Sequence, residues 1–151
     1  MRIVIQKVKE ASVTIEGKII SSIKKGLLVL VGIENEDKQE DIDYLVKKIV
    51  QLRVFNDENG VMNLSVKDVD GDLIIVSQFT LLANTKKGNR PSYIRAAKPD
   101  FSISMYKKFV ANTEQAMCKK VGTGEFGEMM DVSLVNDGPV TVIIDSKQKD
   151  F

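Results

Sequence analysis

Histidine is absent from this sequence of 151 residues, and cysteine occurs once, as Cys118. Without histidine the chain can form neither a Ser-His-Asp triad nor a histidine metal site, and one cysteine is too few for a closed zinc site. Any hydrolysis must therefore take its base from a carboxylate, a lysine, the backbone or the substrate itself. Neither a metal nor another cofactor is expected.

Long apolar runs and a strong charge bias are also missing. No segment is long and apolar enough to span a bilayer, and the opening MRIVIQKVKE becomes charged too early for a signal peptide. A lone cysteine cannot form an internal disulfide, which fits a reducing cytosol, so a cytoplasmic location is expected. The net charge of +1 excludes a strongly basic protein that binds nucleic acid nonspecifically, but it allows a local basic patch. The length favours one domain over residues 1–151.

Alternating and helical patterns predict an α+β fold. Two helices are expected. The first has a plausible start at Asp37 with Glu40 and runs to Leu52, and the second runs from about Asp100 to Lys120. Strands are expected at 2–8, 11–17, 18–23, 27–33, around a hairpin turn at 56–60, after the Asp70-Gly71 turn, and at 121–126, 131–136 and 139–145. Two main helices against many short strands favour an antiparallel sheet that curls toward a barrel.

The stretch IIVSQFTLLA, residues 74–83, places polar groups inside an apolar strand. One interpretation is a strand end whose polar side chains face solvent; the other is a pocket floor, because burying an unpaired polar group would cost roughly 1–3 kcal/mol. Read as a strand, the stretch has Gln78 and Thr80 on one face and Ser77 and Phe79 on the other. No activating base is close in sequence, so Thr80 is expected to donate to an oxyanion rather than to attack as a nucleophile.

Three further stretches each allow two interpretations. NDGPVT at 136–141 is typical of a hairpin turn, but a Gly-Pro bond can also be cis in a specified geometry. GTGEFGEMM at 122–130 is a turn with one anchoring aromatic, or a seat for a flat base formed by Phe126 and Met130. A basic loop is either solvated or a phosphate-contacting patch, and it carries Lys86, Lys87, Arg90, Arg95 and Lys98.

Taken together, RIVIQKV, ASVTI, GLLVLVGI, SQFTL, the Gly-Phe-Gly type loop and NDGPVT resemble the D-aminoacyl-tRNA deacylases of the D-Tyr-tRNA deacylase family. The resemblance runs over essentially the whole chain in the same order, and SQFT with NxGPVT is a specific combination. It implies the fold of that family, a homodimer, and hydrolysis of the ester that links a D-amino acid to the terminal adenosine of tRNA. Glycyl-tRNA, as mischarged on tRNA-Ala, is implied as a further substrate.

The resemblance also implies residue roles. Ser77, Gln78, Phe79 and Thr80 would line the pocket beneath the scissile ester, so the polar break in the strand would be the floor of the active site. A cis Gly-Pro bond would enter the partner subunit's pocket and exclude L-amino acids, within the motif Asn136, Gly138, Pro139, Val140 and Thr141. The terminal adenine would lie on Phe126, Gly127 and Met130. Catalysis would be RNA-assisted: the terminal 2′-hydroxyl helps to activate water, and backbone N–H groups stabilise the oxyanion.

One departure from the family pattern is Lys7, which stands where the family usually has an arginine that helps to fix the Gly-Pro loop. Lysine keeps the charge but lacks the planar fork of donors, which bears on how rigidly the loop is held and how strictly L-amino acids are excluded. Two alternatives are a tRNA- or nucleic-acid-binding module without catalysis, and an editing-like structural subunit attached to a synthetase.

Overall fold

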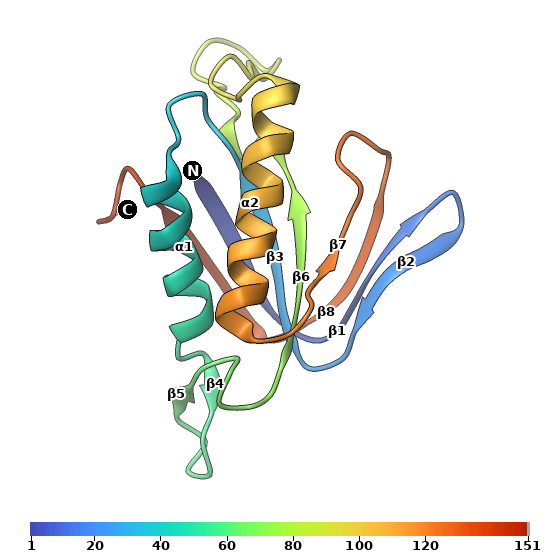
Figure 1. Cartoon of the computed structure of the whole chain (residues 1–151), viewed down its shortest axis with the longest axis vertical. Helices are drawn as coiled ribbons and strands as arrows, with labels where there is room; N and C mark the ends of the chain where they lie inside the picture. The colour runs from blue at the N-terminus through green and yellow to red at the C-terminus, as the bar shows by residue number, and fades with distance from the viewer. Residues whose placement is uncertain (151) are drawn as a thin grey trace.

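The alternating start of the chain forms one long strand, β1 (Arg2–Ile15), instead of two separate ones. It pairs antiparallel with β3 (Gly26–Gly32) along its first half and with β2 (Lys18–Ile23) along its second half. The other edge of β1 is covered by β8 (Asp131–Asp145). This computed structural model describes residues 1–150, and Figure 1 shows β1 between β8 and β3 behind the two helices.

The remaining elements follow in chain order. They are α1 (Gln39–Gln51), β4 (Phe55–Asn56), β5 (Met62–Leu64), β6 (Asp72–Ser77), the 3₁₀ turn η1 (Phe79–Leu82), α2 (Pro99–Met117) and β7 (Gly122–Thr123). The predicted hairpin around 56–60 is present as β4 and β5. Within residues 1–150, no helix combines the length and the apolar character needed to cross a membrane.

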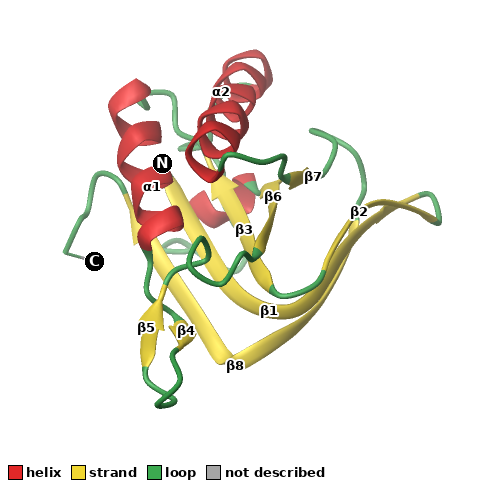
Figure 2. Cartoon of the chain, turned by 60° about the horizontal axis from the view of Figure 1, so that its bottom comes forward, coloured by secondary structure: helices red, strands yellow, loops and turns green. Residues whose placement is uncertain are grey.

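The sheet is mixed, so the predicted antiparallel sheet is confirmed only in part: β1 pairs antiparallel with β2, β3 and β8, but two other pairs are parallel. β6 runs parallel to β3, and β7 runs parallel to β6. The reason is the connection: the chain leaves β3, crosses over through α1 and the β4–β5 hairpin, and returns in the same direction. The barrel-like character was predicted correctly. Ser21 Oγ of β2 donates to the Thr123 carbonyl of β7 at 2.6 Å, which brings the two ends of the curled sheet together (Figure 2).

The strands at the C-terminal end also differ from the prediction. Residues 131–136 and 139–145 belong to one strand, β8, and not to two strands joined by a hairpin turn. Asn136 pairs with Val8 and Thr141 pairs with Gln6, so the four residues between them lie opposite Lys7 alone. The NDGPVT segment is therefore a bulge within a strand, because the residues on both sides of it pair with the same edge of β1.

Both helices cover one face of the sheet. Leu27, Val29 and Ile75 point toward the helices, whereas Leu28 and Ile74 point into the smaller core on the other face. From α2, the predicted inner residues Tyr106, Phe109, Thr113 and Met117 are buried. Lys120 lies beyond the helix, which ends at Met117 with Cys118 in a left-handed conformation.

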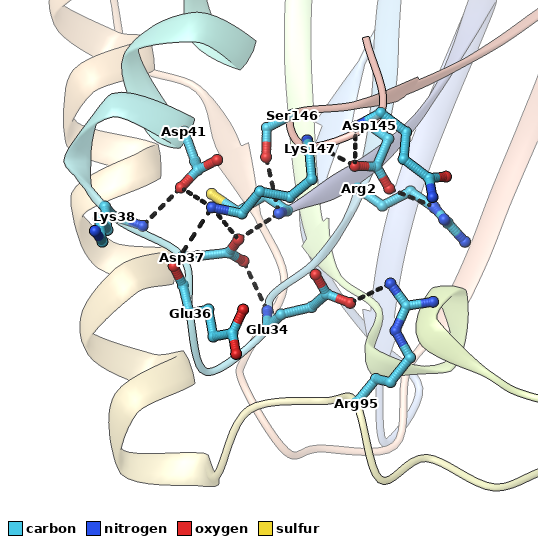
Figure 3. A network of polar contacts seen from close by, with 12 residues as sticks. Arg2, Glu34, Glu36, Asp37, Lys38, Asp41, Arg95, Asp145, Ser146 and Lys147 are labelled. Carbon is cyan, nitrogen blue, oxygen red and sulfur yellow. Dashed lines mark hydrogen bonds and ion pairs between the residues drawn. The ribbon is translucent and has the colours of Figure 1, made fainter. Parts of the chain in front are cut away.

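The start of α1 lies one residue later than predicted, because Asp37 has another role. The backbone N–H of Lys38 donates to Asp41 at 2.8 Å, which closes the first turn. Asp37 is buried and pairs with the ammonium group of Met1, which also donates to Ser146 Oγ at 2.9 Å. Figure 3 shows this network joining the start of β1, the approach to α1 and the end of β8.

Candidate active site

The apolar strand stops where its polar residues begin. β6 ends at Ser77, and the Gln78 N–H donates to the Val31 carbonyl of β3 at 2.7 Å. The chain then turns into η1, whose first hydrogen bond runs from the Leu81 N–H to the Gln78 carbonyl at 3.2 Å. The strand thus ends at Ser77, as one of the two interpretations expected, but Gln78–Thr80 leave it in a turn and do not form two alternating strand faces.

This turn leaves backbone donors at its start. The N–H groups of Phe79 and Thr80 precede the first hydrogen bond of the turn, so the turn supplies no acceptor for them. The Gln78 side-chain amide donates to Thr80 Oγ1. An amide cannot remove a proton from a hydroxyl, so this contact orients the Thr80 hydroxyl without activating it as a nucleophile.

The loop between β7 and β8 lies beside the same end of β6. Because β7 pairs in parallel with Ile74 and Ile75, the chain continues past Val76 toward Ser77. A side chain at Gly124 would place its Cβ 2.3 Å from Met130 Sδ, so the absence of a side chain lets Met130 close over the loop. Phe126 is half-buried, and Gly127 is exposed with a φ of 86°.

Tyr106 fixes this loop, a role that nothing in its sequence context indicated beyond helical spacing. Its hydroxyl donates to the Ile75 carbonyl at 2.7 Å and accepts from the Gly124 N–H. Its ring lies 6.2 Å from the ring of Phe126, centroid to centroid. Burial raises the pKa of Tyr106 to about 12, so the group stays a neutral hydrogen-bonding bridge at physiological pH.

Arg2 fixes the other end of η1 and was also not identified from the sequence. Its guanidinium donates to the Leu81 carbonyl at 3.2 Å and to the Asp145 carboxylate at 3.0 Å. Burial acts to raise the pKa of Asp145, but the backbone N–H groups of Lys147 and Gln148, with Arg2, hold it below its ordinary value. The anchor is therefore a charged pair over most of the pH range.

The bulge in β8 is held closed by one side chain. Asn136 Nδ2 donates to the Lys7 carbonyl and to the Val140 carbonyl, each at 3.0 Å. Gly138 has a φ of 125°, and a Cβ there would lie 2.8 Å from Val140 Cγ2, so only glycine fits without strain. The Gly138-Pro139 peptide bond is cis, and both residues are exposed.

Lys7 lies beneath this bulge. Its side chain is 7% exposed, and its ammonium group lies 3.4 Å from a carboxylate oxygen of Asp137, the residue that begins the bulge. The same ammonium group lies 5.6 Å from the centre of the Phe55 ring. The Lys7 side chain thus contacts the bulge through an ion pair with Asp137, where an arginine could offer two parallel hydrogen bonds.

The two predicted motifs do not meet within one chain. Ser77 pairs with Val31, which pairs with Ile3 of β1, whereas the bulge lies beyond β1 and opposite Lys7. The motifs are thus three strands and four residues of register apart. By standard spacings this is roughly 14 Å across the sheet and 13 Å along it. Within one chain the bulge therefore lies apart from the Ser77–Thr80 turn in the sheet.

The basic loop has an exposed tip and an anchored stem. Lys86, Lys87 and Arg90 are exposed at the tip. Arg95 is instead paired with Glu34 at 2.6 Å, and Lys98 immediately precedes α2. Only part of the predicted phosphate-contacting set is therefore available at the tip.

Among the described residues, no cluster of three or more acidic or cysteine side chains forms a candidate metal site.

Comparison with known proteins gives a consistent picture. The model of the family described as D-Tyr-tRNA(Tyr) deacylase matches residues 4–145. A D-aminoacyl-tRNA deacylase of Flavobacterium johnsoniae is 63% identical over 150 residues, covering 99% of this chain and 100% of the relative. The counterpart in Bacteroides thetaiotaomicron is 59% identical over the same length, covering 99% and 100%.

Two solved structures share the fold. The structure of a protein named c-Myc DNA Unwinding Element Binding Protein superposes with a TM-score of 0.91 at 39% identity, covering 96% of this chain and 98% of that one. A probable eukaryotic D-amino acid tRNA deacylase superposes with a TM-score of 0.81 at 15% identity, covering 95% and 97%. The resemblance noted in the sequence is thereby confirmed: the chain belongs to the D-Tyr-tRNA(Tyr) deacylase family.

Proposed function

We propose that this protein is a hydrolase that cleaves the ester bond of D-aminoacyl-tRNA and releases the free D-amino acid and tRNA. The observation that carries the proposal is membership of the D-Tyr-tRNA(Tyr) deacylase family over residues 4–145. The geometry is compatible with that reaction, since β6 ends in a turn with available backbone donors beside a loop that carries an aromatic ring.

In the proposed mechanism the protein positions the ester and the substrate supplies the chemistry it lacks. The N–H groups of Phe79 and Thr80 would stabilise the developing oxyanion, with the Thr80 hydroxyl held by Gln78. Phe126, Gly127 and Met130 would hold the terminal adenine. As the family resemblance implies, the 2′-hydroxyl of the terminal ribose would help to activate the attacking water, which fits the absence of histidine from the chain.

Chiral selection is proposed to come from the partner subunit of a homodimer. Gly138 and Pro139 of the bulge are exposed, and the bulge lies three strands away from Ser77 in the sheet of its own chain. A two-fold axis would deliver Gly138 and Pro139 to the partner's pocket, where their backbone would occupy the space of an L side chain. Glycine has no side chain to exclude, so glycyl-tRNA, as mischarged on tRNA-Ala, is included in the proposed substrates.

The direct test is turnover with matched D- and L-tyrosyl-tRNA at protein concentrations far below that of the substrate. We expect many D-Tyr-tRNA molecules to be hydrolysed per protein and L-Tyr-tRNA to be spared. Binding without turnover would refute the proposal and favour a nucleic-acid-binding module, in line with the name of the 39% identical protein.

The shared site has its own test. One variant carries Gln78→Ala and Thr80→Ala, and the other carries Asn136→Ala, which removes the two hydrogen bonds that close the bulge. Mixed dimers of these two variants contain one site with an intact turn and an intact bulge only if the two come from different subunits. Recovery of selective hydrolysis on mixing is expected, and no recovery would exclude a shared site.

A further inference from the structure

The aromatic side chain of Phe79 is unusual for a residue inside the proposed pocket motif. It is 55% exposed, and it projects from a turn of only four residues. A half-exposed ring on so short a turn has several accessible rotamers unless another group restrains it. Its ring contact is with Tyr93: the two centroids are 5.0 Å apart, and the planes meet at 76°.

Tyr93 comes from the anchored stem of the basic loop. Asn84 and Ser92 exchange two backbone hydrogen bonds, at 2.8 and 2.9 Å. The Ala96 N–H donates to the Tyr93 carbonyl at 2.9 Å, and the Ala97 N–H donates to the Ile33 carbonyl at 2.8 Å, which ties the stem to the end of β3. The backbone around Tyr93 is therefore fixed even though the tip of the loop is exposed.

The same stem is secured by charge. Arg95 Nη2 lies 2.6 Å from Glu34 Oε1, just beyond β3. β3 is also the strand whose Val31 carbonyl accepts the Gln78 N–H at the start of the pocket motif. The turn and the stem that follows it in the chain thus rest on the same end of β3. The ring contact between Phe79 and Tyr93 joins the turn to the stem at the protein surface.

From this geometry we infer that Tyr93 is a positioning residue for the deacylation reaction: its ring holds the ring of Phe79, and thereby the turn whose N–H groups face the ester. The inference rests on the proposed function. An edge-to-face pair is a modest interaction, so its loss is expected to lower kcat by roughly two- to tenfold. KM should stay unchanged, because Tyr93 acts on the turn and not on the tRNA.

The test compares Tyr93→Leu, which keeps apolar bulk without a ring, with Tyr93→Phe, which keeps the ring. Ile94→Ala is the matched control, since Ile94 is the neighbouring side chain and is 85% exposed. We expect Tyr93→Leu to lower kcat on D-Tyr-tRNA, Tyr93→Phe to restore it, and Ile94→Ala to leave it unchanged. Phe79→Leu should cost a similar factor, and the double variant no more than either single one. A raised KM with normal kcat, or additive losses, would overturn the inference.

A second measurement reads the ring contact without any substrate. The chain has three tyrosines, Tyr44, Tyr93 and Tyr106, so fluorotyrosine labelling gives a simple fluorine NMR spectrum in which Tyr93→Phe identifies the Tyr93 signal. We expect Phe79→Leu to shift that signal, and an unmoved signal would overturn the inference. A wild-type protein without turnover would refute the proposed function instead, and the fluorine shift would then decide alone whether Tyr93 holds the Phe79 ring.

Discussion

The Asn136→Ala variant gives the sharpest test of the bulge in β8. The amide of Asn136 donates to the carbonyls of Lys7 and Val140, each at 3.0 Å, and so closes a four-residue bulge against one residue of β1. Each hydrogen bond contributes about 0.5–1.5 kcal/mol net, so the variant should lose roughly 1–3 kcal/mol of unfolding free energy. For a chain of this size that lowers Tm by roughly 2–12 °C.

The functional consequence is separate from the loss of stability. A loosened bulge no longer places the Gly138 and Pro139 backbone in one position, so the ratio of D-Tyr-tRNA to L-Tyr-tRNA hydrolysis should fall. Urea unfolding and initial rates on both substrates measure the two effects. Ser133→Ala is the control, because Ser133 is an exposed residue of the same strand, and such changes usually stay within about 0.5 kcal/mol. Unchanged stability together with unchanged selectivity would refute the role of Asn136 as the closing residue.

Four further outcomes are expected. Thr80→Ala should slow deacylation without abolishing it, and mass spectrometry should detect no aminoacyl-enzyme; a trapped ester on Thr80 would contradict the mechanism. A tRNA ending in 2′-deoxyadenosine should bind but turn over far more slowly, and equal single-turnover rates would show that the protein supplies the base. Replacing both Lys86 and Lys87 by alanine should lower the slope of log affinity against log salt by roughly 0.7–0.9 per lost phosphate contact, and an unchanged slope would return the loop to a solvated role. Burial acts to raise the pKa of Asp41, but hydrogen bonds led by Lys147 lower it from 3.8 to about 2. Its stabilisation is therefore present above pH 3.8 and lost as the pH falls toward 2, so the Tm advantage of wild type over Asp41→Asn should shrink across that window.

Local patterns predicted most of the elements because each depends on neighbours in sequence. The apolar spacing of Ile42, Leu45 and Ile49 is sufficient to predict α1, and the wholly apolar 27–33 segment predicts a central strand. The start of α1 was missed by one residue because Asp37 is used by the ammonium group of Met1, a contact across 36 residues. A capping pattern cannot reveal that a distant group competes for the same carboxylate.

For the two motifs, SQFT and NxGPVT, the sequence likewise identified the residues but not their backbone structure. SQFT and NxGPVT were both recognisable as sequences, but their local signals were misleading about structure. Turn-forming residues at 136–141 predicted a hairpin, yet pairing with β1 on both sides converts them into a bulge. A strand end was one of the two interpretations of Ser77–Thr80, but the sequence did not indicate that the chain turns into η1 where the pairing of β6 with β3 ends.

The sequence by itself determined the element types, the absence of histidine chemistry and the family, since these depend on composition, periodicity and motif identity. Only the tertiary structure decided the direction of β6, the bulge opposite Lys7, and the contacts that Arg2, Tyr106 and Tyr93 make around the end of β6 and the turn η1. The physical reason is that these features are contacts between residues that are not neighbours in sequence. Their energies come from strand register, shared hydrogen bonds and ring contacts, which no local stretch of residues encodes.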